Sequence, residues 1–203
     1  LTTSHVGYDK EFFKVLEKSG CKGLLIGFES VNQDAQGYIN KGVNKTDNYE
    51  ILVKELHGIG VLINGCFAFG GDSDNKDVFA RTVEQVQRLR IDLPRYSILT
   101  PFPNTELYRE LALQKRIFEH NFAMYDVEHV VFEPKNMTAD ELYRGTEWAW
   151  HETYKTSSIL QRINKLSPIS YIKNFAYQNY ANKFENFTKE VMCDNSDIPE
   201  VYA

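Results

Sequence analysis

Cysteine is scarce in this sequence, and its spacing argues against two common kinds of scaffold. The 203 residues include three cysteines, Cys21, Cys66 and Cys193, which are odd in number and far apart. Disulfide-rich secreted domains and structural zinc sites both rely on paired, closely spaced cysteines. We therefore expect neither class, and we expect the thiols to be buried or incidental in a reducing cytoplasm.

Long apolar runs and an excess of positive charge are also missing. No apolar run approaches the roughly 20 residues that a membrane-spanning helix needs, and the opening residues resemble no signal peptide. The formal net charge is −5, whereas domains that bind nucleic acid usually carry a basic face. These features predict a cytoplasmic protein with no membrane span and no nucleic-acid partner.

The sequence does contain the rhythm of a folded α/β domain. With 42% hydrophobic and 25% charged residues it has the composition of a globular protein. Strand, loop and helix recur three times, and this alternation is typical of βαβ units with a parallel sheet. The apolar runs at residues 24–28 and 61–69 predict strands buried on both faces. The expected strands are residues 22–28, 61–69 and 95–100, and the expected helices are residues 8–20, 46–60, 74–90 and 104–114.

The pattern changes after about residue 116. Residues 125–134 alternate and predict an edge strand that Pro134 ends. A helix over residues 137–164 is expected to begin at a capping box of Thr138 and Glu141. Ser167 and Pro168 predict the start of a last helix over residues 167–191. We thus divide the chain into βα units over residues 1–116 and an extension, one strand and two long helices, over residues 117–203.

Polar residues follow the first predicted strand, where parallel sheets usually carry their chemistry. Glu29 and Ser30 end the stretch "CKGLLIGFES". A carboxylate there can accept hydrogen bonds from hydroxyl or ammonium groups of a cofactor. It can equally cap the turn that follows, and the pattern alone leaves both interpretations open.

The next two strand ends have features of their own. Gly70 and Gly71 let the backbone approach a ligand closely, although a tight turn needs no ligand. In "TPFPNT" two prolines make a rigid turn, Asn104 suits a left-handed conformation, and Thr105 can cap the next helix. No metal-ligand set is recognisable, because "WHETYK" has Lys155 where a zinc-protease helix needs histidine.

Taken in order, these stretches resemble one enzyme family. The series comprises "CKGLLIGFES", a Lys-Gly pair at residues 41–42, "GIGVLINGCFAFGGD" and "PFPNTELY". It is similar to radical S-adenosylmethionine (SAM) enzymes, in particular the subgroup with a cobalamin-binding domain. The resemblance covers residues 9–116 in detail and extends to about residue 160 through "VVFEPKNMTADELYRG".

The resemblance implies a cofactor site at the strand ends. Glu29 and Ser30 would reach the ribose and methionine part of SAM, the strand from Gly65 would line the adenine side, and backbone after the third strand would contact adenine. The cofactor-binding residues so implied are Glu29, Ser30, Gly65, Phe69, Gly70, Leu99, Thr100 and Pro101. No catalytic residue is assigned.

The resemblance also implies a partial (β/α) barrel and an activity. The family binds a four-iron four-sulfur cluster through CxxxCxxC, a motif that this sequence lacks. We therefore expect about three βα units from the C-terminal half of such a barrel, inactive when alone. The parent enzyme would cleave SAM to a radical, act on a small-molecule substrate and resemble cobalamin-dependent methyltransferases.

Two alternatives come from other functional classes. A phosphate-binding α/β barrel could use Gly70 and Gly71, although "GGDSD" is acidic where phosphate needs donors. A non-enzymatic interaction module could dock through its C-terminal helices. An open sheet also predicts some self-association through its exposed edge or through those helices.

Overall fold

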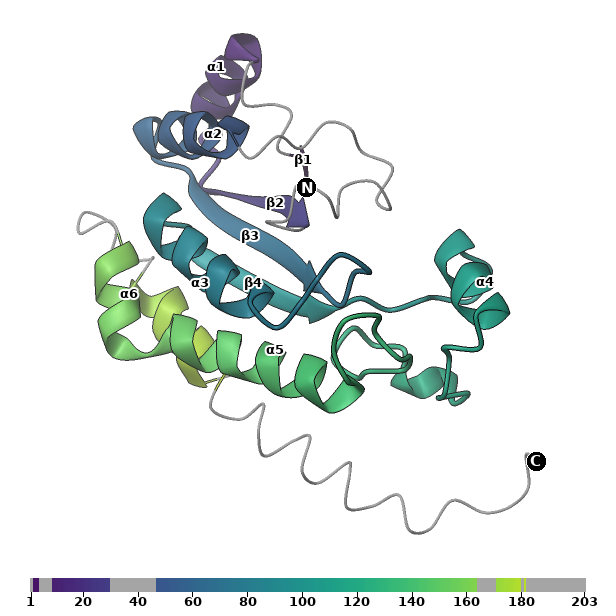
Figure 1. Cartoon of the computed structure of the whole chain (residues 1–203). Coiled ribbons are helices and arrows are strands. Elements are labelled where there is room, and N and C mark those ends of the chain that lie inside the picture. The colour runs from purple at the N-terminus through teal and green to yellow at the C-terminus, as the bar shows by residue number, and fades with distance from the viewer. Residues whose placement is uncertain (1, 4–8, 30–46, 164–170, 180, 182–203) are drawn as a thin grey trace.

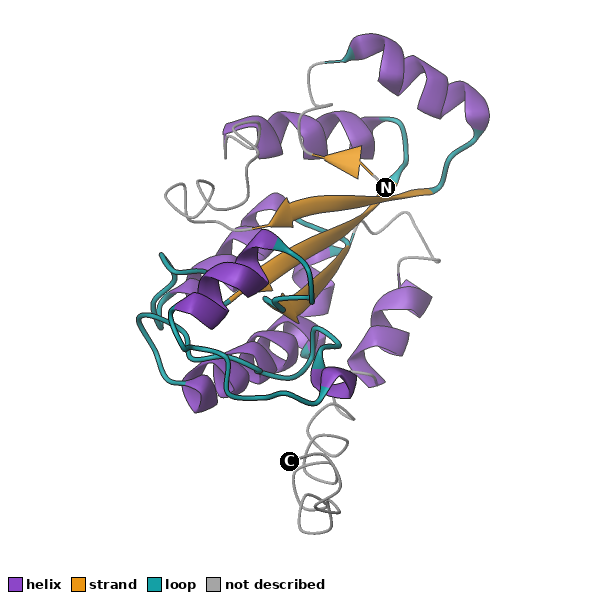
Figure 2. Ribbon diagram, turned by 90° about the vertical axis from the view of Figure 1, so that its right-hand side faces the viewer, coloured by secondary structure: helices purple, strands orange, loops and turns teal. Residues whose placement is uncertain are grey.

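The protein is represented by a computed structural model, which describes residues 2–3, 9–29, 47–163, 171–179 and 181 (Figure 1). One sheet holds four strands in the order β1-β2-β3-β4, and every neighbouring pair is parallel. Figure 2 shows the three longer strands lying side by side. The strands are β1 (Thr2–Thr3), β2 (Gly23–Glu29), β3 (Leu62–Phe69) and β4 (Leu93–Ile98).

Helices connect the strands as the sequence rhythm predicts. The α1 helix lies between β1 and β2, the α2 helix between β2 and β3, and the α3 helix between β3 and β4, so the described elements include three successive βαβ units. The α/β prediction is confirmed. The helices are α1 (Lys10–Ser19), α2 (Asp47–Gly58), α3 (Val78–Leu89), α4 (Glu106–Leu113), α5 (Ala139–Tyr154) and α6 (Thr156–Arg162), with a 3-10 turn, η3, at Phe122–Met124.

Local signals explain where several helices begin and end. The α1 helix ends at Gly20, which has a φ of 69° and suits the left-handed position of a helix C-cap. The predicted capping box is present at the start of α5, where Thr138 and Glu141 each accept a hydrogen bond from the other's backbone N–H. These termini follow from the sequence alone.

In the described part of the chain, three helices pack on the same face of the sheet. In β3 the side chains alternate strictly between half-buried and buried positions. Helices α2, α3 and α5 contact the buried face, where Tyr49 packs on Phe28, Phe79 on Phe69 and Trp150 on Tyr96. The predicted burial of both strand faces is therefore confirmed for one face of β3, while the residues on its other face are half-buried. An apolar run such as residues 61–69 indicates a buried strand, but the residues of the run do not show which elements cover each of its faces.

Aromatic rings form the centre of the core on the covered face. The Phe28 and Phe67 rings stack with centroids 5.3 Å apart, and the Phe69 and Tyr96 rings stack at 5.5 Å. Trp150 of α5 meets Tyr96 edge-on at 5.6 Å. Rings in contact contribute beyond the apolar area that they bury. These contacting rings extend across β2, β3 and β4 and hold α5 against the sheet.

The edge strand predicted over residues 125–134 is wrong. This segment contains one isolated bridge, in which Phe132 pairs antiparallel with Ile117. The carboxylate of Asp126 accepts hydrogen bonds from the backbone N–H groups of residues 128 and 129, at 2.9 and 3.0 Å. Val127 has a φ of 67°, which an extended strand cannot accommodate. A local turn at Asp126 thus replaces the strand that the alternation predicted.

The helix predicted over residues 137–164 is interrupted. Lys155 has a ψ of 146°, so α5 ends there after 16 residues and α6 follows with 7. Residues 171–179 are also helical. The expectation of two long helices is therefore corrected to α5, a short α6 and this further helical run, while Ser167 and Pro168 lie outside the described residues.

Candidate functional site

The carboxyl ends of the three longer strands meet at one edge of the sheet. Glu29 is the last residue of β2 and lies opposite Phe67 in the strand register. The backbone N–H of Leu99 donates to the carbonyl of Phe69 at 2.8 Å, which holds the ends of β3 and β4 together. The structure thus brings Glu29, Gly70 and Leu99 to the same edge. Ser30 and the Lys41-Gly42 pair lie outside the described residues.

The Gly70-Gly71 turn is closed by a side chain of the chain itself. Gly70 has a φ of 105°, a conformation that favours glycine. The backbone N–H groups of Gly70 and Gly71 both donate to Oδ2 of Asp74, at 3.1 and 3.0 Å. A bound phosphate would need those same donors. The buried Asp74 carboxylate therefore occupies the place that the phosphate-binding alternative requires.

Gly65 and Phe69 lie on the covered face of the sheet. A Cβ atom at Gly65 would stand 2.8 Å from Cγ2 of Ile91, so glycine allows close packing here. The ring of Phe69 is buried against Phe79 and Tyr96. Both residues shape the core beneath the strand ends, and the adenine-side role implied for them stays a prediction.

Leu99, Thr100 and Pro101 continue from β4 across the edge. Thr100 is 7% exposed and its hydroxyl donates to the carbonyl of Ile98 at 3.1 Å. The loop then turns at Asn104, whose φ of 68° confirms the left-handed position expected there. Thr105 caps α4 by accepting a hydrogen bond from the backbone N–H of Tyr108 at 3.2 Å, which is also as expected.

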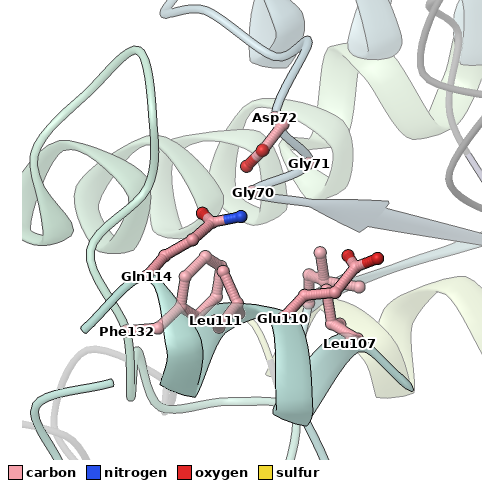
Figure 3. A pocket seen from close by; sticks show the side chains of 9 residues that line it. Gly70, Gly71, Asp72, Leu107, Glu110, Leu111, Gln114 and Phe132 are labelled. Atoms are coloured by element: carbon pink, nitrogen blue, oxygen red, sulfur yellow. The ribbon is translucent and has the colours of Figure 1, made fainter. Parts of the chain in front are cut away.

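A small pocket lies beside this edge, between the Gly70-Gly71 turn and α4 (Figure 3). Its volume is about 30 Å³, which is room for a water molecule or two. Figure 3 shows Asp72 and Gln114 extending toward each other above an apolar floor. Adenosine is far larger, so SAM would have to lie along the edge outside this pocket. The lining residues are Gly70, Gly71, Asp72, Leu99, Leu107, Glu110, Leu111, Gln114 and Phe132.

An ion pair that sequence reasoning missed borders the pocket. The guanidinium of Arg116 lies 2.8 Å from the carboxylate of Asp72, and both side chains are largely buried. Arg116 also donates to the backbone carbonyl of Glu133 at 2.7 Å. Asp72 is thereby fixed at the carboxyl end of β3. The acidic residue in "GGD" was visible in the sequence, but its partner 44 positions later was not.

A second missed pair lies beside the end of β4. Nδ1 of His129 lies 2.8 Å from the Asp126 carboxylate, and the adjacent carbonyl of Val127 accepts a hydrogen bond from the N–H of Ile98. Burial by itself would raise the pKa of Asp126, but hydrogen bonds from the His129 ring and from two backbone N–H groups lower it below the usual value. The D-x-x-H spacing is the sequence signal that could have indicated this pair.

The residues described here do not form a metal centre. Among them, no group of three or more histidine, cysteine or acidic side chains is placed to hold a metal ion. Cys21 precedes β2 and Cys66 lies in the middle of β3, while Cys193 is outside the described residues. The positions of Cys21 and Cys66, 45 residues apart in the sequence, do not fit the compact ligand loop of an iron–sulfur cluster. In the same part of the chain, no helix is both long and apolar enough to cross a membrane.

Comparison with known proteins identifies homologues. No family model matches the chain. It is 35% identical over 175 residues to bacteriochlorophyllide d C-12(1)-methyltransferase of Chlorobaculum tepidum, covering 85% of this chain and 38% of that protein. It is 27% identical to the C-8(2)-methyltransferase of the same organism, covering 84% and 40%. The anaerobic magnesium-protoporphyrin IX monomethyl ester cyclase of Cereibacter sphaeroides is 28% identical, covering 68% and 22%.

The coverage of these matches determines how specifically the chain can be assigned to a family. The chain spans 40% or less of the length of each of these relatives. The resemblance found in the strand-end motifs and the homologues agree with each other. The chain is thus a homologue of bacteriochlorophyllide methyltransferases and of a magnesium-protoporphyrin IX monomethyl ester cyclase, which supports the general radical SAM family.

Proposed function

We propose that this chain forms the SAM-binding edge and part of the substrate wall of a radical SAM methyltransferase that acts on a tetrapyrrole. The observation that carries the proposal is the meeting of Glu29, Gly70 and Leu99 at one sheet edge. These are residues that the family resemblance assigns to SAM, and the edge borders the half-buried face of β3.

A partial barrel is the architecture that we propose for this sheet. The parallel strands follow one another in sequence order, as they do in a (β/α) barrel. Helices cover one face, which would be the outside of the barrel, and leave the other face toward its interior. The chain would supply the C-terminal strands of the barrel, in keeping with its match to under half of each relative.

The cofactors divide between this chain and the rest of such an enzyme. SAM would lie across the strand ends, held by the Glu29 carboxylate and by backbone from Leu99 to Pro101. When bound there, SAM supplies a methyl group or, on reductive cleavage, a radical. The cluster ligands do not fit the cysteines of this chain, so we assign the cluster, and with it cobalamin, to residues beyond these 203.

The names of the relatives suggest the substrate class. Two of them act on bacteriochlorophyllide and one on magnesium-protoporphyrin IX monomethyl ester. We extend this class to the present chain, with the macrocycle placed against the open sheet face. Small residues there, including Gly27 and Ala68, would let a flat ring approach the strands closely.

Isothermal titration calorimetry with SAM tests this proposal. We expect saturable binding, and we expect Glu29→Gln to weaken it about tenfold because one charge-assisted hydrogen-bond acceptor is lost. Glu55→Gln on the exposed side of α2 is the matched control and should leave the affinity unchanged. Absence of SAM binding, or equal loss in both variants, would contradict the proposed site.

A further inference from the structure

The open face of the sheet carries a cationic side chain on its last strand, β4. Arg95 is exposed, and its position in β4 is paired with Cys66 of β3. Because side chains alternate along strands, Arg95 shares its face with Ser97 and Cys66, opposite the buried Tyr96. The guanidinium therefore projects from the side that would face a barrel interior.

Arg95 differs from two other arginines of the chain in having no protein anion beside it. Among the described residues it has neither an ion pair nor a side-chain hydrogen bond, whereas Arg116 pairs with Asp72, and Arg162 donates to three backbone carbonyls. An exposed guanidinium that no protein side chain occupies is free to pair with a carboxylate. Arg95 thus provides an unfilled position for an anion.

A second unfilled polar atom lies on the same face. Asn64 is two residues before Cys66 on β3, and its side-chain oxygen is buried without a hydrogen-bond partner. Buried polar atoms of native proteins are nearly always paired, with protein, water or ligand. Asn64 and Arg95 together form a polar patch on this face of the sheet, beside the small residues Gly27 and Ala68.

We propose that Arg95 binds the free carboxylate of the tetrapyrrole substrate. This inference rests on the proposed function. A monomethyl ester of the dicarboxylic protoporphyrin keeps one ionised carboxylate, and a chlorophyllide is likewise a free acid. Arginine matches a carboxylate with two parallel hydrogen bonds, which gives orientation as well as affinity. The macrocycle would lie over Gly27 and Ala68 with its carboxylate at Arg95.

The carboxylate of SAM is a second group that Arg95 could bind. The position of Arg95 along β4 argues against this pairing. Arg95 of β4 lies four residues before Leu99, which follows the end of that strand. At about 3.3 Å per residue this separates it by about 13 Å from the edge where SAM is placed. Arg95 therefore lies on the open face at a distance from the cofactor edge.

The experiment compares two magnesium porphyrins that differ in one charge. Magnesium-protoporphyrin IX monomethyl ester and its dimethyl ester are titrated into the chain, and binding is followed by the macrocycle absorption. We expect the wild type to bind the monomethyl ester about tenfold more tightly, the effect of one charge-assisted contact. Arg95→Gln should abolish this preference and leave the affinity for the dimethyl ester unchanged. Arg88→Gln, on α3 beside Glu50, is the matched control and should retain the preference for the monomethyl ester.

Each result decides between the hypotheses. Equal binding of the two esters by the wild type, or an unchanged preference in Arg95→Gln, would overturn the role of Arg95 while leaving the proposed function standing. Weaker SAM binding by Arg95→Gln with the ester preference intact would assign Arg95 to the SAM carboxylate instead. If neither porphyrin binds the wild-type chain while SAM does, the tetrapyrrole assignment fails, and the role of Arg95 fails with it.

Discussion

The guanidinium of Arg162, in the last turn of α6, donates a hydrogen bond of 2.9 Å to the backbone carbonyl of Ile91, just before β4. A second nitrogen of the same group donates to the carbonyl of Thr153 at 2.8 Å. The Arg162 side chain is almost fully buried and lies over the ring of Tyr154. One residue therefore ties α6 to α5 and to the amino end of the sheet, far along the strands from the candidate site.

Replacing Arg162 with methionine should destabilise the fold. The Ile91 and Thr153 carbonyls would remain buried without their donor, and each such group costs about 1–3 kcal/mol. We expect the free energy of unfolding to fall by about 3 kcal/mol in urea titrations followed by circular dichroism. Arg144→Met, at an exposed ion pair with Asp140, is the control and should leave the free energy of unfolding almost unchanged. Equal losses would show that Arg162 has no special role.

Replacing Gly145 with alanine should separate α5 from α3. A Cβ atom at Gly145 would overlap the ring of Phe79, and overpacking of this kind costs about 1–3 kcal/mol. The control is Gly58→Ala at the end of α2, where a Cβ atom meets nothing within 4 Å. We expect a lower thermal midpoint for the first variant only, and a midpoint of Gly145→Ala equal to wild type would contradict the close packing of these helices.

The turn at Asp126 predicts a pH-dependent contribution to stability. Its folded-state pKa lies below the usual 3.8, because hydrogen bonds from the His129 ring and two backbone N–H groups outweigh the effect of burial. A lowered folded pKa means that the contribution is present above about pH 4 and is lost as the pH falls through the folded value. Asp126→Asn should therefore be less stable than wild type at pH 6, with a smaller difference at pH 3. A difference independent of pH would refute this.

Anaerobic iron–sulfur reconstitution of this chain should fail. Three scattered cysteines cannot supply the compact ligand loop of a four-iron cluster. We expect no cluster absorption band after gel filtration and no deoxyadenosine from SAM under reducing conditions. The triple Cys→Ser variant is the control and should behave identically. A stable cluster that cleaves SAM would place the cluster ligands within this chain after all.

The sequence predicts where helices and strands lie along the chain better than it predicts how they pack against one another. Helix ends depend on neighbouring residues, so Gly20 and the Thr138–Glu141 box could be recognised directly. The edge strand over residues 125–134 failed because one side chain, Asp126, competes locally with strand geometry. Which face of the sheet is covered depends on where α2, α3 and α5 pack, and the sequence of a single strand does not show this.

The candidate site was predictable in part for the same reason. Strand ends meet at one edge in any parallel sheet, so Glu29, Gly70 and Leu99 could be grouped from their order. The inward direction of Gly65 and Phe69 could have been read from their two-residue spacing with the buried Phe67. The pairing of Asp72 with Arg116 joins residues far apart in sequence, and only the folded chain shows it.

The most direct test of a SAM site at the strand ends is a two-dimensional ¹H–¹⁵N NMR titration of this 23.5 kDa chain with SAM. We expect the largest shifts at the backbone N–H groups of Glu29, Gly70, Leu99 and Thr100, with little change in α5. Shifts confined to the outer surface of α3 and α5, or no shifts at saturating SAM, would contradict a cofactor edge at the carboxyl ends of the strands.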